Sequence, residues 1–222
     1  MRPMTKKLLA AFCGVSLLAM GATGAQAAKT LVFCSEGSPE GFNPAFYTAG
    51  TTFDASSRPI YNRLVEFERG TTKIGPALAE KWDVSDDGLE YTFYLRKGVK
   101  FHNNEPFNAQ VAKWNLERAA KPENGNSHPE YFNGIESIAT PDNHTLEIRL
   151  KDVDALFIAH MAEGDAVMLP MKSDTDAKSN PIGTGPFKFV KWVRGDRVEM
   201  SRFDGYWNPF LPYLDRAPSG DE

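Results

Sequence analysis

The sequence predicts an α+β fold, and two observations lead to this prediction. Three pairs of alternating apolar and polar runs are each joined by a short turn, which is the pattern of β-hairpins. Stretches between these pairs carry apolar residues at helical spacing. The mixture of hairpins and intervening helices indicates the α+β class.

The first 28 residues have the three zones of a secretory signal peptide. Three basic residues precede an apolar run from Leu8 to about Ala22, and small residues follow it. The apolar run is shorter than the ~20 residues that a membrane-spanning helix needs. We therefore expect cleavage between Ala27 and Lys29 and export to the periplasm.

Composition narrows the function classes. The chain is 41% hydrophobic with a formal net charge of −4, which fits a globular protein and gives no reason to expect a nucleic-acid partner. After cleavage Cys34 is the single cysteine, so no disulfide can form within the chain.

The first elements are a strand and a helix. Thr30–Cys34 is a β-rich apolar run that ends in turn formers, and it predicts a buried first strand. Apolar residues at helical spacing predict a helix between Thr51 and Glu66, with Pro59 near its start or at a kink.

The first predicted hairpin pairs Lys81–Ser85 with Leu89–Leu95 across an Asp-Gly turn. A helix over Asn108–Ala120 follows, because an asparagine suited to the N-cap precedes apolar residues on adjoining helical faces. We expect this helix to pack on that hairpin.

Two further hairpins complete the pattern. Ile135–Thr140 pairs with Thr145–Leu150, and Ala155–Ala162 then predicts a short apolar helix. Phe187–Val193 pairs with Val198–Phe203 around a glycine-containing turn.

No catalytic, metal or cofactor site emerges from the residues. His102, His128, His144 and His160 lack the close spacing of zinc ligands, which favours surface or loop positions. No nucleophile motif is present, so we expect no enzymatic activity. The Gly183–Pro186 stretch lacks the lysine and hydroxyl of a phosphate loop, and it predicts a rigid turn that enters a strand.

Six short motifs occur in order behind the signal peptide. They are Leu31–Pro44, Tyr61–Val65, Leu78–Trp82, Leu95–His102, Asn180–Phe187 and Phe203–Trp207. Their order and spacing resemble the peptide-binding branch of the bacterial extracellular solute-binding proteins. The resemblance covers nearly the whole chain after the signal peptide.

The resemblance implies a periplasmic binding protein-like fold in which two lobes close over a peptide and a small extra lobe is attached. Residues 29–60 and 180–222 would form part of lobe I, and residues 61–179 would form the extra lobe. The second lobe, which supplies the aspartate and arginine that hold the peptide ends, is expected to be absent. Cys34 matches a family cysteine whose disulfide partner lies farther along the family's chain.

The resemblance also implies a ligand site. Thr48-Ala49-Gly50 matches a family segment that faces the peptide from lobe I. A glycine lets backbone amides approach a peptide, and a threonine hydroxyl can donate and accept hydrogen bonds. From the residues alone, an ordinary polar turn is the preferred interpretation, because these residue types favour turns.

The implied function is extracytoplasmic capture of dipeptides or short oligopeptides for an ABC importer. The expected partners are the peptide and the importer's membrane permease, with a monomeric protein and no cofactor. Two alternatives stay open: a truncated remnant that cannot bind ligand, and a binder of haem or another small solute.

Overall fold

The computed structural model describes residues 30–172 and 178–208. From Val32 onward the described residues belong to one compact unit. The predicted signal peptide, residues 1–28, lies outside the described residues. Within the described ranges, no helix has the length and hydropathy that a membrane span requires.

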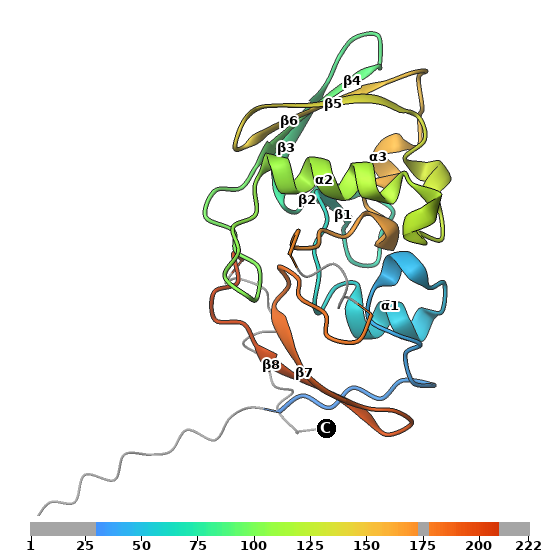
Figure 1. The fold of residues 1–222 in the computed structure, drawn as a ribbon, viewed down its shortest axis with the longest axis vertical. Coiled ribbons are helices and arrows are strands. Elements are labelled where there is room, and N and C mark those ends of the chain that lie inside the picture. The colour runs from blue at the N-terminus through green and yellow to red at the C-terminus, as the bar shows by residue number, and fades with distance from the viewer. Residues whose placement is uncertain (1–29, 173–177, 209–222) are drawn as a thin grey trace, which may run out of the picture. The chain divides into compact units, whose positions relative to one another are not determined.

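A four-stranded antiparallel sheet forms one layer of this unit (Figure 1). Its strands are β3 (Ala79–Val84), β4 (Glu90–Leu95), β5 (Ile135–Asp142) and β6 (Thr145–Leu150). The strand order is β3-β4-β6-β5, so the first two predicted hairpins are confirmed and are joined through β4 and β6. Gly88 in the first turn has φ +72°, a value that residues other than glycine rarely adopt.

The sheet has an apolar and a polar face because side chains alternate along a strand. Phe93 and Leu95 of β4 and Leu146 of β6 are buried on one face. On the other face Arg149 pairs with Glu90, and its Nε lies 3.1 Å from Glu136.

Helix α2 (Ala109–Ala119) covers the apolar face (Figure 1). It begins where the sequence predicts, since the Asn108 side chain accepts a 3.0 Å hydrogen bond from the Val111 N–H. Helix α2 shares the larger buried cluster with Phe93 and Leu95 of the first hairpin, as expected, and it packs most extensively against β5 and β6. The β4–β6 pairing places the second hairpin within the same sheet, beneath the helix.

Two predictions near the start of the described chain were wrong. Residues 30–34 form no strand, and Val32 and Phe33 are 78% and 70% exposed, because no strand of the described chain pairs with them. The predicted helix over 51–66 is only α1 (Gly50–Ser56), which is followed by a turn that contains Pro59.

Six further short elements were not predicted, and one helix is shorter than expected. The 3-10 helices are η1 (Pro44–Phe46), η2 (Pro122–Asn124), η3 (Pro129–Tyr131) and η4 (Gly164–Ala166); the short strands β1 (Val65–Phe67) and β2 (Ile74–Pro76) pair with each other; and α3 spans Phe157–His160. Single turns and three-residue strands are too short to produce a periodic pattern.

The third predicted hairpin is confirmed as β7 (Phe187–Val193) and β8 (Arg197–Arg202). Gly195 in its turn has φ +75°. The hairpin lies beside a second buried cluster centred on Phe42 and Tyr61, with Phe189 packed against it. The ring centroids of Phe42 and Phe189 are 4.9 Å apart.

The core therefore has two clusters. The larger one fills the space between α2 and the sheet and includes Leu64, Leu116 and Phe157. The smaller one lies between β7–β8 and residues 42–61, and also includes Val167. The two predicted lobes within this one compact unit stay a prediction.

Candidate functional site

The predicted ligand residues lie together where the connection after η1 enters α1, whose first residue is Gly50. Thr48 and Gly50 are exposed, and Ala49 is half-buried at the N-cap position of α1. We call the stretch Thr48–Gly50 the ligand loop. Its contact with a ligand stays a prediction.

The start of the ligand loop is fixed by the Phe-Asn-Pro motif. Asn43 is fully buried, and its Oδ1 accepts a 3.1 Å hydrogen bond from the Ala45 N–H. The Asn43 carbonyl accepts a second bond from the Phe46 N–H at 3.0 Å. Pro44 suits the first helical position because it has no N–H to satisfy. The motif thus folds into η1 and leads the chain into the loop.

Tyr47, just before the ligand loop, packs on a glycine. A Cβ added to Gly41 would lie 2.6 Å from Cε2 of the Tyr47 ring, so the ring lies directly against the Gly41 backbone. Farther on, the Thr52 hydroxyl oxygen accepts a 3.1 Å hydrogen bond from the Glu40 N–H. The segment before η1 therefore contacts the chain on both sides of the loop.

Gly50 is not required by the fold. Its φ is not in the left-handed region, and nothing lies within 4 Å of the place where a Cβ would stand. In a helix the first N–H groups have no partner within the helix. The loop can therefore offer backbone N–H groups and the Thr48 hydroxyl to the polar groups of a ligand.

Asn62, from the Tyr61–Val65 motif, connects three distant segments. Its Oδ1 accepts hydrogen bonds from the Thr184 hydroxyl at 3.1 Å and from Trp207 Nε1 at 3.0 Å. Its Nδ2 donates to Glu66 Oε1 at 3.1 Å. Arg96 lies over the Trp207 ring, 4.5 Å from its centroid. Residues from three of the six sequence motifs thus meet at one buried amide, and Arg96 from a fourth motif packs on the Trp207 ring.

The glycines of the Gly183–Pro186 turn allow a close backbone approach. A Cβ on Gly183 would lie 1.9 Å from the Ile60 carbonyl oxygen. The Gly183 N–H donates to His102 Nδ1 at 3.3 Å, so Nε2 carries the proton and donates to the Gly185 carbonyl at 3.0 Å. Burial lowers the His102 pKa to about 4. This histidine holds a turn in place, a role that sequence reasoning did not find.

A match to a family model shows which protein family this chain belongs to. Residues 73–217 match the model described as bacterial extracellular solute-binding proteins, family 5 Middle. The chain belongs to this family. The resemblance inferred from the six motifs is confirmed, and so is the α+β class.

Two sequence relatives are named for different ligands, a dipeptide and haem. The chain is 45% identical over 221 residues to the dipeptide-binding protein of Escherichia coli (strain K12), which covers 87% of this chain and 41% of the relative. It is 37% identical over 244 residues to heme-binding protein A of Haemophilus influenzae, covering 94% of this chain and 44% of the relative. The chain therefore spans less than half the length of these family 5 relatives.

A solved structure has a similar fold over most of this chain. The periplasmic binding protein of Helicobacter pylori in complex with the peptide STSA matches with a TM-score of 0.70 and 32% identity. The match covers 78% of this chain and 39% of the Helicobacter protein.

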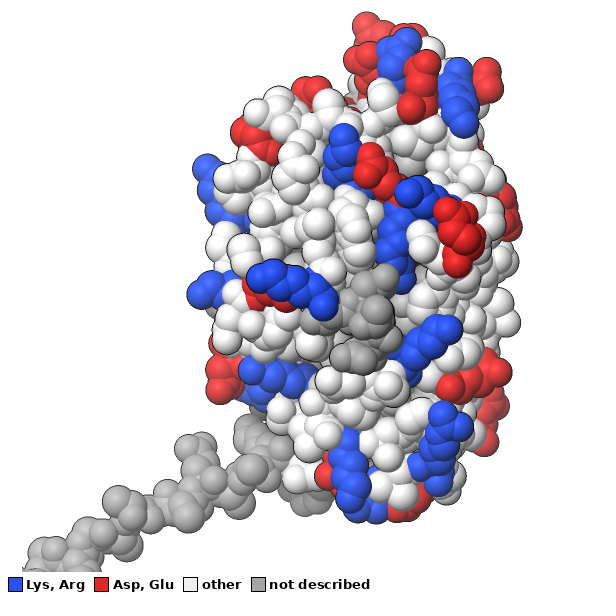
Figure 2. Space-filling view, in the orientation of Figure 1, with Lys and Arg blue, Asp and Glu red and all other residues white. Residues whose placement is uncertain are grey.

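Other candidate sites in this family 5 chain are few. Among the described residues, no group of three or more His, Cys, Asp or Glu side chains could hold a metal ion. Cys34 is an exposed free thiol. A groove of about 310 Å³ lies beside Trp207, with Arg58 and Glu66 on its walls, and it contains none of the ligand-loop residues. Figure 2 shows positive and negative side chains interspersed over the visible face.

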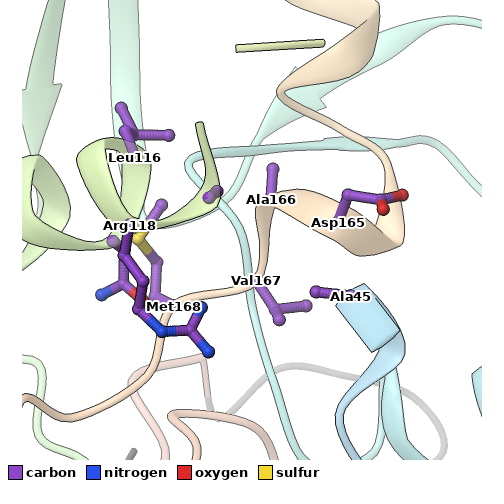
Figure 3. A pocket seen from close by; sticks show the side chains of 9 residues that line it. Ala45, Leu116, Arg118, Asp165, Ala166, Val167 and Met168 are labelled. Carbon is purple, nitrogen blue, oxygen red and sulfur yellow. The ribbon is translucent and has the colours of Figure 1, made fainter. Parts of the chain in front are cut away.

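Asp165 in η4 is a buried carboxyl that sequence reasoning missed. It is 6% exposed, and its Oδ1 has no hydrogen-bond partner within the described part of the chain. Burial raises its pKa to about 6, while His128 opposes this rise and Glu163 and Glu130 add to it. In Figure 3 its side chain lies on the opposite side of a small cavity from Arg118.

Replacing Asp165 by asparagine is expected to stabilise the protein above pH 6. The folded pKa exceeds the ordinary value of 3.8, so the charged carboxylate costs stability as the pH rises from 3.8 through 6. Asp165→Asn removes this cost, and we expect a gain of about 1–2 kcal/mol at pH 8. Urea unfolding at pH 8 and pH 4 measures it.

The matched control for Asp165→Asn is Glu163→Gln, which removes a charge from an exposed neighbour. We expect the control to change the unfolding free energy by less than about 0.5 kcal/mol at either pH. A gain for Asp165→Asn that is equal at pH 8 and pH 4 would contradict the assignment of the effect to the carboxylate charge.

Proposed function

We propose that this chain is part of the extracytoplasmic solute-binding component of an ABC importer and binds dipeptides or short oligopeptides. The observation that supports this most is the 45% identity, over 87% of the chain, to a dipeptide-binding protein. The shared fold with peptide-bound periplasmic proteins supports it further. The protein captures its ligand without chemical conversion and delivers it to a membrane permease.

In this proposal the chain supplies one wall of the ligand site. Thr48, Ala49 and Gly50 form that wall, because Thr48 and Gly50 are exposed on a loop whose flanks are held by buried contacts. The resemblance assigns the residues that hold the peptide ends to a second lobe. Tight binding therefore needs polypeptide beyond the part that this chain matches, which is 41% of the Escherichia coli relative.

The proposed location is the periplasm, and the proposed protein is a monomer that has lost residues 1–28 as a signal peptide. The three-zone pattern of these residues supports export. The similar Helicobacter pylori protein is a periplasmic, ABC transporter-associated binding protein, which supports this location. N-terminal sequencing of protein from a periplasmic extract tests the cleavage site.

Calorimetric titration with L-alanyl-L-alanine tests the proposed function. The probe is added to residues 29–222 and to a version completed with the second lobe of the Escherichia coli dipeptide-binding protein. We expect micromolar binding by the completed version alone. Binding by neither version would contradict the proposed function and would favour a remnant that cannot bind ligand.

Substitutions in the ligand loop are expected to weaken this binding. Thr48→Ala removes a hydroxyl, and Gly50→Ala puts a methyl group where a ligand backbone approaches; we expect each to raise Kd about 5- to 10-fold. Gly134→Ala is the control, since it also lies in open space without a left-handed φ. Unchanged affinity in both loop variants would contradict the site while leaving the function standing.

Haem is a second candidate ligand. The observation that favours it is the 37% identity, over 94% of the chain, to heme-binding protein A of Haemophilus influenzae. Adding haem to the completed version before the dipeptide distinguishes the two ligands. Loss of dipeptide binding, together with a haem absorption band that titrates with the protein, would favour haem.

A further inference from the structure

The 3-10 helix η4 contacts the chain on both sides of the ligand loop. Before the loop, η1 packs against η4, and Ala45 of η1 lines the same small cavity as Asp165 and Ala166 (Figure 3). After the loop, the Phe53 side chain of α1 reaches Gly164 at the start of η4.

The contact between Gly164 and Phe53 leaves no room for a side chain. A Cβ on Gly164 would lie 2.1 Å from Cε1 and 2.8 Å from Cδ1 of Phe53. The φ of Gly164 is not in the left-handed region, so the backbone conformation itself would accept other residues. Any residue larger than glycine would have to displace the Phe53 ring, which lies directly against the Gly164 backbone.

The segment that carries η4 is itself fixed to α2 and to Asn62. Asn115 of α2 donates to the Leu169 carbonyl at 2.9 Å and accepts from the Leu169 N–H at 3.0 Å. The Met168 N–H donates to the Asn62 carbonyl at 3.0 Å. Three buried hydrogen bonds therefore fix the position of the chain just after η4.

Contacts on both flanks matter because the ligand loop itself is exposed. An exposed three-residue loop has few contacts of its own, and its order depends on its ends. One end is set by η1 and the other by the start of α1. Both ends lie against η4, and Phe53 is the third residue after the loop.

We propose that Gly164 is a positioning residue for the ligand loop and acts through Phe53. This inference rests on the proposed function insofar as it concerns ligand affinity. Gly164 contacts no ligand in this proposal, and it lies in residues 61–179, the part predicted as the extra lobe. That part of the chain would then determine the geometry of a binding wall that belongs to lobe I.

Hydrogen exchange of the unliganded chain tests the positioning directly. In Gly164→Ala, the new methyl group displaces the Phe53 ring, and we expect amides of residues 47–53 to exchange about tenfold faster. Amides of β4 and β6 are expected to exchange as in the parent chain. The control Gly134→Ala is expected to leave residues 47–53 unchanged, because its Cβ meets nothing within 4 Å.

A double-mutant cycle shows whether the effect passes through the ring. Phe53→Ala removes all three atoms that the new Cβ would meet. We therefore expect Gly164→Ala to change exchange at residues 47–53 less than twofold when it is added to Phe53→Ala. Equal effects of Gly164→Ala in both backgrounds, or no effect in the parent chain, would overturn the proposal.

Titration with L-alanyl-L-alanine separates this inference from the proposed function. In the version completed with a second lobe, we expect Gly164→Ala to raise Kd about fivefold or more, with Gly134→Ala unchanged. If Gly164→Ala binds the dipeptide as tightly as the parent does, the inference about affinity is overturned while the proposed function stands. If the parent itself does not bind, the proposed function fails, and hydrogen exchange still decides whether Gly164 positions the loop.

Discussion

Gly183→Ala is expected to destabilise the protein by about 3–5 kcal/mol, the largest effect among the substitutions considered. Its Cβ would lie 1.9 Å from the Ile60 carbonyl oxygen and 2.7 Å from the carbonyl carbon. These are backbone atoms, which cannot rotate away as a side chain can. The turn must move, and the hydrogen bonds between it and His102 are then lost. Urea unfolding followed by tryptophan fluorescence measures the change.

The control for Gly183→Ala is again Gly134→Ala, which makes the same chemical change in open space. Its effect is expected to stay within about 1 kcal/mol. Gly185→Ala should resemble Gly183→Ala, since its Cβ would lie 2.6 Å from the Ile60 carbonyl carbon. A loss below about 1 kcal/mol in both Gly183→Ala and Gly185→Ala would show that the turn does not depend on this close approach.

The second large effect is a loss of stability between pH 6.5 and pH 4 that depends on His102. Its folded pKa is about 4, below the ordinary value of 6.5, so the fold favours the neutral ring. The contribution is complete above pH 6.5 and falls as the pH drops through 4, because the unfolded chain binds the proton first. The loss is at most about 3 kcal/mol. Unfolding free energies at half-unit pH steps measure it.

His102→Gln separates this titration from that of the other groups. The glutamine amide can still donate to the Gly185 carbonyl, but it cannot titrate and does not replace the Nδ1 acceptor. We expect a loss of about 1 kcal/mol at pH 7.5 and a flatter curve between pH 6.5 and 4. Curves of equal slope for the variant and the parent would contradict the role of His102.

Local patterns predicted the elements whose partners are close in sequence. The three hairpins are correct because alternation and a short turn specify both strands, and in two of them a glycine forms the turn. Gly88 and Gly195 adopt the left-handed φ that such turns use. Helix α2 is correct because its cap, Asn108, bonds within its own first turn. These contacts span few residues, so the sequence specifies them without tertiary information.

The errors lie where tertiary contacts override the local pattern. Ile60 and Leu64 are spaced like one helical face, but the chain between them is not helical and both residues are fully buried. Each lies in a different cluster, a division that periodicity does not reveal. Val32 and Phe33 resemble a buried strand, yet a strand needs a neighbour, and none of the described strands pairs with them.

The candidate site shows the same division. The residues of the ligand loop were inferred from their resemblance to a family motif; Thr48 and Gly50 are exposed, and contact with a ligand stays a prediction. Gly164 and Asp165 carry no sequence signal, because a glycine that makes room for a ring looks the same in sequence as one in an ordinary turn. Only the packing of η4 against Phe53 distinguishes these two kinds of glycine.

The sequence by itself determined the family, the three hairpins, the capped helix and the segment proposed to face a ligand. These depend on short-range periodicity, turn chemistry and motif order, all of which can be read along the chain. The tertiary structure alone decided how the motifs meet at Asn62 and why Gly183 needs its glycine. It also decided that η4 packs against η1 and α1 on the two sides of the ligand loop. Such contacts join residues more than a hundred positions apart, and close packing, unlike periodicity, leaves no local pattern in the sequence.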